Sequence, residues 1–141
     1  GDHRAPVVAL AMDAKAGRLE CVDCGHGYAA MVRKESGAVL IQAAEAMPLG
    51  VNPEQATTVA DLAMGPDDGL IVCSDGVVEQ PGGSEGSQFG VARVLACLGG
   101  AGEMGQRAVA LKAALDAHAG VEKAAAFQDD VTVLSVTVDP A

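Results

Sequence analysis

Aromatic residues and positive charges are scarce in this chain. Only 2% of its 141 residues are aromatic and none is Trp, so it lacks the stacking surfaces that proteins use for single-stranded nucleic acid. Its 9 Lys and Arg are outnumbered by 19 Asp and Glu, which gives a formal net charge of −10. An acidic surface repels phosphate backbones and anionic lipid. We therefore expect no nucleic-acid partner, and we expect any chemistry on phosphate groups to need a metal cation.

Long apolar runs are missing as well. No stretch approaches the roughly 20 consecutive apolar residues of a membrane span, and residues 1–4 are not followed by the apolar segment of a signal peptide. Half of the residues are nevertheless hydrophobic, which is enough for the core of one domain. We expect a cytoplasmic protein without a membrane span, in which residues 1–141 form a single domain or part of one.

The four cysteines include a C-x-x-C pair, Cys21 and Cys24, and such a pair can bind zinc or carry redox chemistry. In a strand, however, residues three apart point to opposite faces, and no second pair completes a zinc site. The pattern therefore favours reduced, mostly buried thiols. Among the other sulfur-containing residues, Met47 and Met64 are predicted to fill the core.

The run from Leu70 to Cys73 is apolar and rich in β-branched residues, which predicts a strand buried on both faces. Asp75 and Gly76 follow this strand after Ser74. A carboxylate at the end of a buried strand is held rigidly, and the glycine lets another group approach closely, as suits a metal ligand. The alternative is an ordinary turn, because Asp-Gly is among the commonest turn dipeptides.

A second group of carboxylates, Asp129 and Asp130, precedes the most strand-like run of the chain, residues 131–138. Adjacent acids repel one another unless a cation or solvent separates them. Because carboxylates occur at the ends of two strands, the sequence favours a site for a divalent cation over an ordinary turn at Asp75.

Hydrophobic periodicity and turn residues predict a run of strands, then two helices, then a last strand that returns to the sheet. The predicted strands are residues 6–12, 18–23, 28–34, 38–42, 55–64, 70–73 and 131–138. The first four are interpreted as a β-meander, and the fifth and sixth as a further hairpin. The predicted helices are residues 91–98 and 104–119, the second ending at Gly120, and residues 80–87 are predicted to be a flexible loop. This order indicates a layered α+β fold.

For the histidines and for two glutamates, a purely structural role has to be weighed against a role near a functional site. His26 lies between two glycines, so it is either a turn residue that hydrogen-bonds the backbone or a residue near a site. His3 and His118 have no partners nearby in the sequence and are predicted to lie at the surface. Glu79 and Glu85 could both lie near a metal, although Glu85 is better explained as a solvated loop residue.

Five short motifs follow one another along the chain. They are Cys24-Gly25-His26, Met47-Pro48-Leu49-Gly50, Cys73-Ser74-Asp75-Gly76-Val77-Val78-Glu79, Phe89-Gly90 and Gln128-Asp129-Asp130-Val131-Thr132. Their order resembles that in the metal-dependent serine/threonine protein phosphatases, the protein phosphatase 2C-like family. The chain resembles this family over nearly its whole length, and it is most similar to the bacterial branch typified by the stage II sporulation protein E (SpoIIE) phosphatase. The resemblance implies a β-sandwich flanked by helices, with two Mn²⁺ or Mg²⁺ ions at one end of the sandwich.

The resemblance also implies a set of site residues. They are Asp75 and Asp129 as catalytic metal ligands, Gly76 and Asp130 as their neighbours in the metal site, and Gly25 and His26 in support. Hard divalent cations prefer oxygen ligands, which carboxylates at strand ends supply. In this kind of site, two ions about 3.5 to 4 Å apart activate a water for in-line attack on phosphorus.

The implied activity is hydrolysis of phosphoserine or phosphothreonine on a regulatory protein, which in this branch is an anti-anti-σ factor. Two other interpretations remain open: a non-catalytic signalling module that binds a partner, and a metal-binding domain with an unrelated role. The chain departs from the family in one respect, because nothing in it matches the early strands with a Gly-Asp motif. We therefore expect a fragment that lacks the N-terminal part of the domain, and a homodimer formed through an exposed sheet edge or face.

Overall fold

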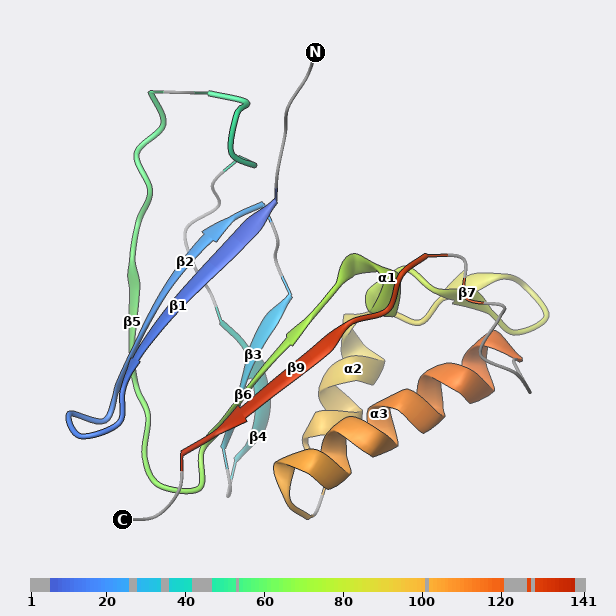
Figure 1. Cartoon of the computed structure of the whole chain (residues 1–141). Coiled ribbons are helices and arrows are strands. Elements are labelled where there is room, and N and C mark those ends of the chain that lie inside the picture. Colours follow the sequence, from blue (N-terminus) through green and yellow to red (C-terminus); the bar gives the residue numbers. More distant parts are fainter. Residues whose placement is uncertain are drawn as a thin grey trace.

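The structure is a computed structural model that describes residues 6–25, 28–33, 36–41, 47–52, 54–100, 102–120, 127 and 129–138. Two antiparallel sheets lie face to face, and helices cover the far side of one of them (Figure 1). The elements are β1 (Val7–Asp13), β2 (Arg18–Cys24), β3 (Ala29–Arg33), β4 (Gly37–Leu40), β5 (Ala60–Ala63), β6 (Gly69–Cys73), α1 (Asp75–Val78), β7 (Pro81–Gly82), β8 (Ser87–Gln88), α2 (Val91–Leu98), α3 (Met104–Ala119) and β9 (Val133–Thr137). This arrangement confirms the layered α+β fold.

The first sheet has the strand order β1-β2-β5. The predicted hairpin is confirmed, because β1 pairs antiparallel with β2 from Asp13 opposite Arg18 to Val7 opposite Cys24. Leu19 is fully buried and faces the second sheet, whereas Ala11 is exposed on the other side. The alternation of buried and exposed side chains follows from the twofold period of a strand with one covered face.

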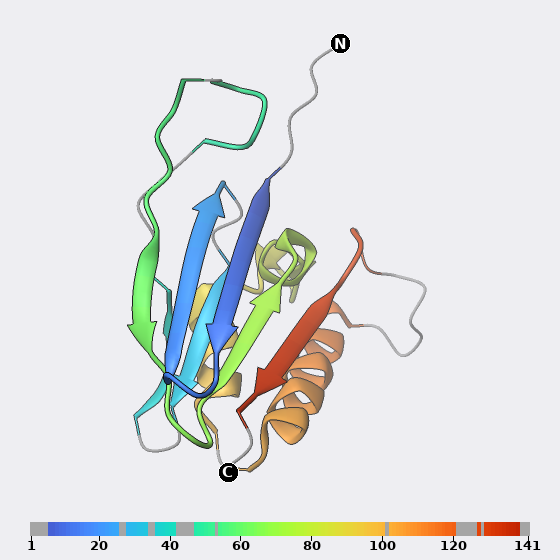
Figure 2. The same ribbon diagram turned by 60° about the vertical axis from the view of Figure 1, so that its left-hand side comes forward.

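The second sheet has the order β4-β3-β6-β9, so β6 is a central strand. One of its faces packs against α2 and α3, where Ile71 joins Leu98 and Leu111 in one core cluster. The other face meets the first sheet through Leu70, and Figure 2 shows the two sheets and the helices as successive layers. The prediction that β6 is buried on both faces is therefore confirmed.

The predicted pairing of the early strands is wrong. β2 pairs with β5 in the first sheet, and β3 pairs with β6 in the second, so the first four strands are two separate hairpins and not a meander. The expected strand over residues 55–64 shortens to β5, and it does not form a hairpin with β6, because the two lie in different sheets. Alternation specifies which side chains face the core, but it does not specify which distant strand becomes the neighbour.

Both predicted helices are confirmed with the expected bounds. Leu111 and Leu115 form the buried stripe of α3, and Gly120 ends the helix in the left-handed conformation at φ 68°. At the other end, the Glu103 carboxylate and the Gln106 side chain form a capping box with the first backbone N–H groups. These signals are local, so the sequence is sufficient to locate them.

Residues 80–87 were expected to be a flexible loop, and this prediction is wrong. Pro81 pairs with Gln88 and Gly82 with Ser87 in the hairpin β7–β8. The pairing continues where the Phe89 N–H donates to the Gln80 carbonyl at 2.8 Å. Glycine-rich composition can equally well form a tight hairpin turn, and residues 83–86 form the turn here.

The sulfur-containing residues follow the predictions with one exception. All four cysteines are free, and Cys21, Cys24 and Cys73 are buried. Met64 is 3% exposed, as expected of a core residue, but Met47 is 54% exposed, because it lies in the irregular segment between β4 and β5 and not in a sheet. Within the described ranges, no helix combines the length and the apolar character needed to cross a membrane.

Candidate metal centre

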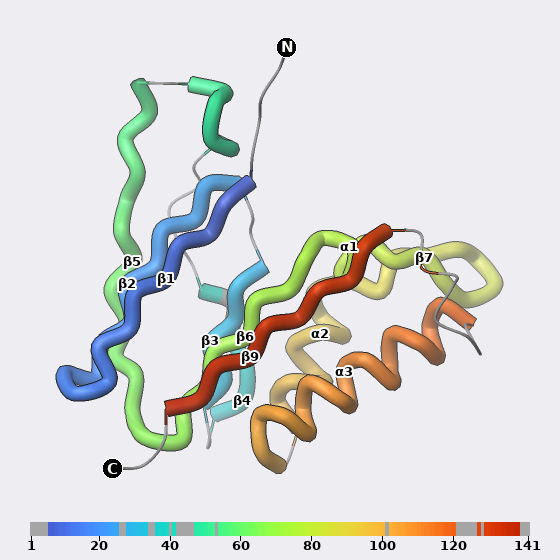
Figure 3. The backbone as a smooth tube through the Cα atoms, in the orientation of Figure 1, coloured from blue at the N-terminus to red at the C-terminus, as the bar shows by residue number. Residues whose placement is uncertain are grey.

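Ser74 joins the two chain segments that carry the candidate ligands. Its backbone N–H donates to the Thr132 carbonyl at 2.9 Å, and its hydroxyl accepts from the Thr132 N–H at 2.9 Å. The same hydroxyl donates to the Asp130 carbonyl at 3.1 Å. Figure 3 shows the result in the chain trace, where the segment entering β9 runs beside the end of β6 and α1. Residues more than 50 positions apart are thereby held together.

Gly76 is the residue that allows this close approach. A Cβ atom on Gly76 would lie 2.2 Å from the Asp130 carbonyl oxygen and 3.4 Å from the Asp129 Cβ. Atoms at 2.2 Å overlap severely, so any larger residue would push the segment before β9 away from α1. The glycine after Asp75 therefore does what the sequence suggested, and its partner is the backbone of the second carboxylate motif.

The two candidate ligands are exposed, and among the described residues each carboxylate accepts a local hydrogen bond from the N–H of the next residue. Asp75 Oδ1 accepts from the Gly76 N–H at 2.8 Å, and Asp129 Oδ1 accepts from the Asp130 N–H at 2.7 Å. Among the described residues, no Lys, Arg or His forms an ion pair with either group. Both carboxylates therefore keep the capacity to bind a cation.

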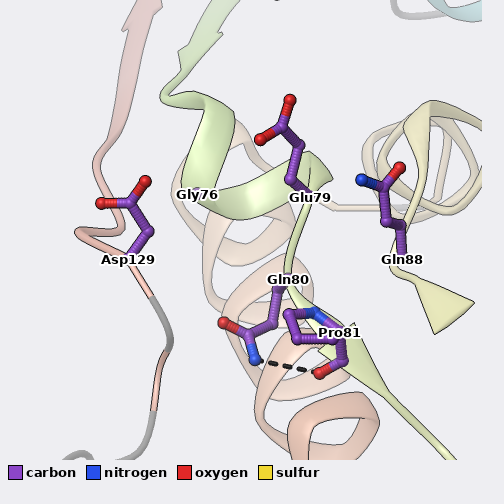
Figure 4. A pocket seen from close by; sticks show the side chains of 6 residues that line it. All are labelled: Gly76, Glu79, Gln80, Pro81, Gln88 and Asp129. Carbon is purple, nitrogen blue, oxygen red and sulfur yellow. Dashed lines mark hydrogen bonds between the residues drawn. The ribbon is translucent and has the colours of Figure 1, made fainter. Parts of the chain in front are cut away.

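An open pocket of about 350 Å³ lies beside these residues. Its lining residues are Gly76, Glu79, Gln80, Pro81, Gln88 and Asp129. Figure 4 shows Asp129 and Gln88 on opposite sides of α1, with the Glu79 carboxylate between them and the Gln80 and Pro81 pair below. The interpretation of Glu79 as a residue near the site is consistent with this position, whereas Glu85 lies exposed in the β7–β8 turn.

Tyr28 is part of the same neighbourhood, and the sequence analysis did not select it. Its carbonyl accepts from the Cys73 N–H at 3.0 Å, which holds it beside the end of β6. Burial raises the pKa of the Tyr28 phenol, and the nearby Glu79 and Asp75 carboxylates raise this pKa further. A recognised pairing of β3 with β6 would have revealed Tyr28, because the residue before Ala29 then lies opposite Cys73.

Gly25 connects two of the short motifs identified in the sequence. It has φ +79°, and a Cβ atom there would lie 2.7 Å from the Pro48 ring. The Cys-Gly-His motif therefore packs against the Met-Pro-Leu-Gly motif through a glycine that no larger residue replaces without strain. His26 lies outside the described residues, so its predicted supporting role stays a prediction.

His118 was predicted to lie at the surface because it has no partners nearby in the sequence, but in the fold its partly exposed ring has partners on other elements. Its ring is half-buried and makes hydrogen-bond contacts to Arg93 and to the Ser87 carbonyl. These partners lie on α2 and β8, and the sequence alone does not show that α3 ends beside them. His3 lies outside the described residues.

The donor set fits a hard divalent cation, but only in part. Asp75 and Asp129 offer carboxylate oxygens, the ligands that Mn²⁺ and Mg²⁺ prefer, on segments locked together by Ser74 and Gly76. Over the described ranges, no group of three or more His, Cys, Asp or Glu side chains is arranged to hold a metal ion. The described residues therefore offer two candidate ligands for such a site, Asp75 and Asp129.

A family model described as stage II sporulation protein E (SpoIIE) matches residues 2–139. No match was found among curated protein sequences.

Two solved phosphatase domains share the fold. The SiaA-PP2C domain of Pseudomonas aeruginosa has a TM-score of 0.71 at 20% identity, over 87% of this chain and 47% of that one. The phosphatase domain of the cell fate determinant SpoIIE from Bacillus subtilis also has a TM-score of 0.71, at 17% identity, over 96% of this chain and 59% of that one. The chain thus spans between 47% and 59% of the length of these two domains.

Proposed function

The chain belongs to the stage II sporulation protein E family, and from this premise we propose that it takes part in the hydrolysis of phosphoserine and phosphothreonine. The substrate in this proposal is a regulatory protein of the anti-anti-σ-factor type, and the cofactor is Mn²⁺ or Mg²⁺. The observation that carries the proposal is the contact between Gly76 and the Asp130 backbone, which brings Asp75 and Asp129 to one end of the sandwich.

In this proposal the chain's own residues bind the cations and receive the substrate. Asp75 and Asp129 hold the cations, with Gly76 and Asp130 as their backbone neighbours and Gly25 and His26 in support. When bound, the divalent cations supply Lewis acidity that activates water and neutralises the charge on phosphoryl oxygens. The pocket lined by Glu79, Pro81 and Gln88 would receive the phosphorylated segment.

Calorimetric titration of Mn²⁺ into the chain tests the proposal, with release of phosphate from a phosphoserine peptide followed in parallel. Asp75→Asn and Asp129→Asn each remove one ligand charge with little change in size, and we expect both variants to lose Mn²⁺ binding. Glu85→Gln is the matched control, because it removes the same charge from an exposed turn outside the pocket. Binding by both Asn variants at the affinity of the unaltered chain would refute the assigned ligands.

The alternative function is a non-catalytic module that keeps the fold and binds a signalling partner. It is favoured by one observation: the described part of the chain contains no group of three or more His, Cys, Asp or Glu side chains that could hold a metal ion. Mn²⁺ binding without phosphate release in the titration above would support this alternative. Phosphate release that depends on Asp75 and Asp129 would exclude it.

Self-association is the second part of the proposal. The edge strands of the second sheet expose apolar side chains, Val39 on β4 and Leu134 on β9, which are 58% and 55% exposed. Exposed apolar edges favour pairing with a second copy. We expect sedimentation velocity to show a dimer that Leu134→Lys dissociates, whereas Val109→Lys on the exposed side of α3 leaves it intact. A monomer at high concentration would contradict this expectation.

The cytoplasm is the location that we propose for the protein. The free state of all four cysteines supports it, because thiols stay reduced in that compartment.

A further inference from the structure

The hairpin β7–β8 forms the wall of the candidate pocket that lies away from Asp129. Pro81 and Gln88, which pair with each other in this hairpin, both line the pocket. The Gln88 side chain is exposed and reaches the pocket from the side opposite Asp129 (Figure 4). The position of this wall therefore depends on what holds the hairpin to the rest of the molecule.

His118, in the last turn of α3, joins the hairpin to α2 through the two nitrogens of its ring. Nδ1 lies 3.0 Å from Arg93 Nη1, and Nε2 lies 2.8 Å from the Ser87 carbonyl oxygen. A guanidinium can only donate, so Nδ1 must accept; a carbonyl can only accept, so Nε2 must carry the proton. Both bonds are satisfied at once only by the neutral ring with its proton on Nε2.

Packing around the ring adds to these two bonds. Phe89, directly after β8, meets the His118 ring edge to face with centroids 5.4 Å apart, and the Arg93 guanidinium lies 6.0 Å from the Phe89 ring centroid. On the other strand, a Cβ atom on Gly82 would lie 1.9 Å from the His118 carbonyl oxygen. The Gly83 N–H donates to the same carbonyl at 3.1 Å. Residues from α2 and from both strands of the hairpin thus converge on His118, at the end of α3.

We propose that His118 is a positioning residue: its neutral ring locks the hairpin β7–β8 to α2 and α3 and thereby sets the pocket wall on which Gln88 contacts the phosphorylated substrate. The substrate contact rests on the proposed function, whereas the lock does not. His118 has no contact with Asp75 or Asp129 among the hydrogen bonds of the described residues, so it acts on the wall and not on the ligands.

Amide hydrogen exchange on the full 141-residue chain tests the lock without any catalysis. The reporters are the N–H groups of Phe89 and Gly90, which donate to the carbonyls of Gln80 and Val78 at 2.8 and 2.9 Å. Removing the side-chain bonds with His118→Ala should speed exchange at both reporters by about tenfold, while amides of β6 keep their rates. Val109→Ala, on an exposed position of the same helix, is the matched control and should change neither.

Two further variants keep the test decisive. His118→Gln retains an N–H donor at the reach of Nε2 and should restore most of the protection of the reporter amides. If His118→Ala disturbs β6 as well, Arg93→Met leaves the His118 ring in place. It removes the donor to Nδ1, together with the Arg93 contacts to the Gln88 carbonyl at 3.5 Å and to the Phe89 ring, and should speed exchange at the reporters by about threefold. Exchange at the rate of the unaltered chain in the Ala and Met variants, or failure of Gln to restore protection, would overturn the lock.

Kinetics on the phosphoserine peptide then tests the substrate contact. His118→Ala and Gln88→Ala should raise KM by about twofold to tenfold, with kcat and Mn²⁺ affinity near those of the unaltered chain. A fall in kcat at constant KM would overturn the assignment of the wall to substrate binding. If the unaltered chain releases no phosphate, the proposed function fails, and the exchange experiment still decides the lock.

Discussion

The two sheets of the molecule differ in how completely they are covered. In the second sheet, β6 has helices on one face and the first sheet on the other, so Ile71 is fully buried. In the first sheet, the outward face carries the exposed Arg18, which pairs with Glu20 and Asp61. The candidate ligand Asp75 follows the doubly covered strand. A strand that is packed on both faces is the better support for a ligand that must be held in place.

Truncating a side chain in each sheet tests whether the second sheet is more completely covered than the first. Ile71→Ala should lower the free energy of unfolding by about 2–5 kcal/mol, because the cavity lies in a core that cannot collapse. Val22→Ala, at a partly exposed position of β2, should cost less than about 1 kcal/mol. Urea unfolding of both variants measures the difference. Equal losses would mean that the two sheets are covered alike.

A second comparison concerns two arginines: Arg107 in α3, which covers the second sheet, and Arg18 in β2 of the first sheet. Arg107 is 9% exposed and donates to the Leu98 carbonyl at 2.7 Å and to the Gly102 carbonyl at 2.9 Å. Arg107→Met removes the donor to the carbonyl of Leu98, the last residue of α2, and to the carbonyl of Gly102, and should cost about 1.5–3 kcal/mol. Arg18→Met breaks only exposed ion pairs, so thermal unfolding should shift little, and less in high salt. A salt-dependent loss for Arg107→Met would contradict its role as a buried cap.

Gly76→Ala tests the contact at the end of β6. The added Cβ overlaps the Asp130 carbonyl oxygen, so we expect a loss of about 1–3 kcal/mol in stability together with loss of Mn²⁺ binding. The control is Gly105→Ala in α3, where a Cβ meets nothing within 4 Å and alanine favours the helix. Retention of Mn²⁺ binding by Gly76→Ala would show that the two carboxylate segments need not touch.

The smallest expected effect is on the pH dependence of stability. Burial raises the pKa of the Cys73 thiol from 9.0 to about 11. Because the folded state holds this proton more tightly than the unfolded state, the stability is fully present below pH 9 and falls as the pH rises from 9 to about 11. Urea midpoints under reducing conditions should show this fall, and Cys73→Ala should make it shallower. An unchanged slope in that variant would assign the fall to other groups.

The parts of the fold that were predicted correctly depend on local signals. The bounds of α2 and α3 follow from apolar spacing and from glycines at their ends, such as Gly120. The hairpin β1–β2 follows from strict alternation on either side of a turn. The pairing of β2 with β5 was missed, because no local pattern encodes a partner about 40 residues away.

The residues of the candidate site also fall into two groups, those predicted from local motifs and those that were missed. Asp75, Gly76 and Asp129 were selected from two short motifs, and Gly76 now has a physical reason to be glycine. Tyr28 and His118 were missed, because each acquires its neighbours from another element. His118 was predicted to lie at the surface, and the sequence did not show that its partly exposed ring contacts both α2 and β8.

The sequence by itself determined the class of the fold, the helices, the buried strand β6 and the identity of the candidate metal ligands, because periodicity, glycine stops and short motifs are properties of neighbouring residues. Only the tertiary structure decided which strands pair, that Ser74 and Gly76 join the two carboxylate segments, and that His118 holds the wall of the pocket. These features are contacts between residues far apart in the chain, and they exist only when packing brings the residues together.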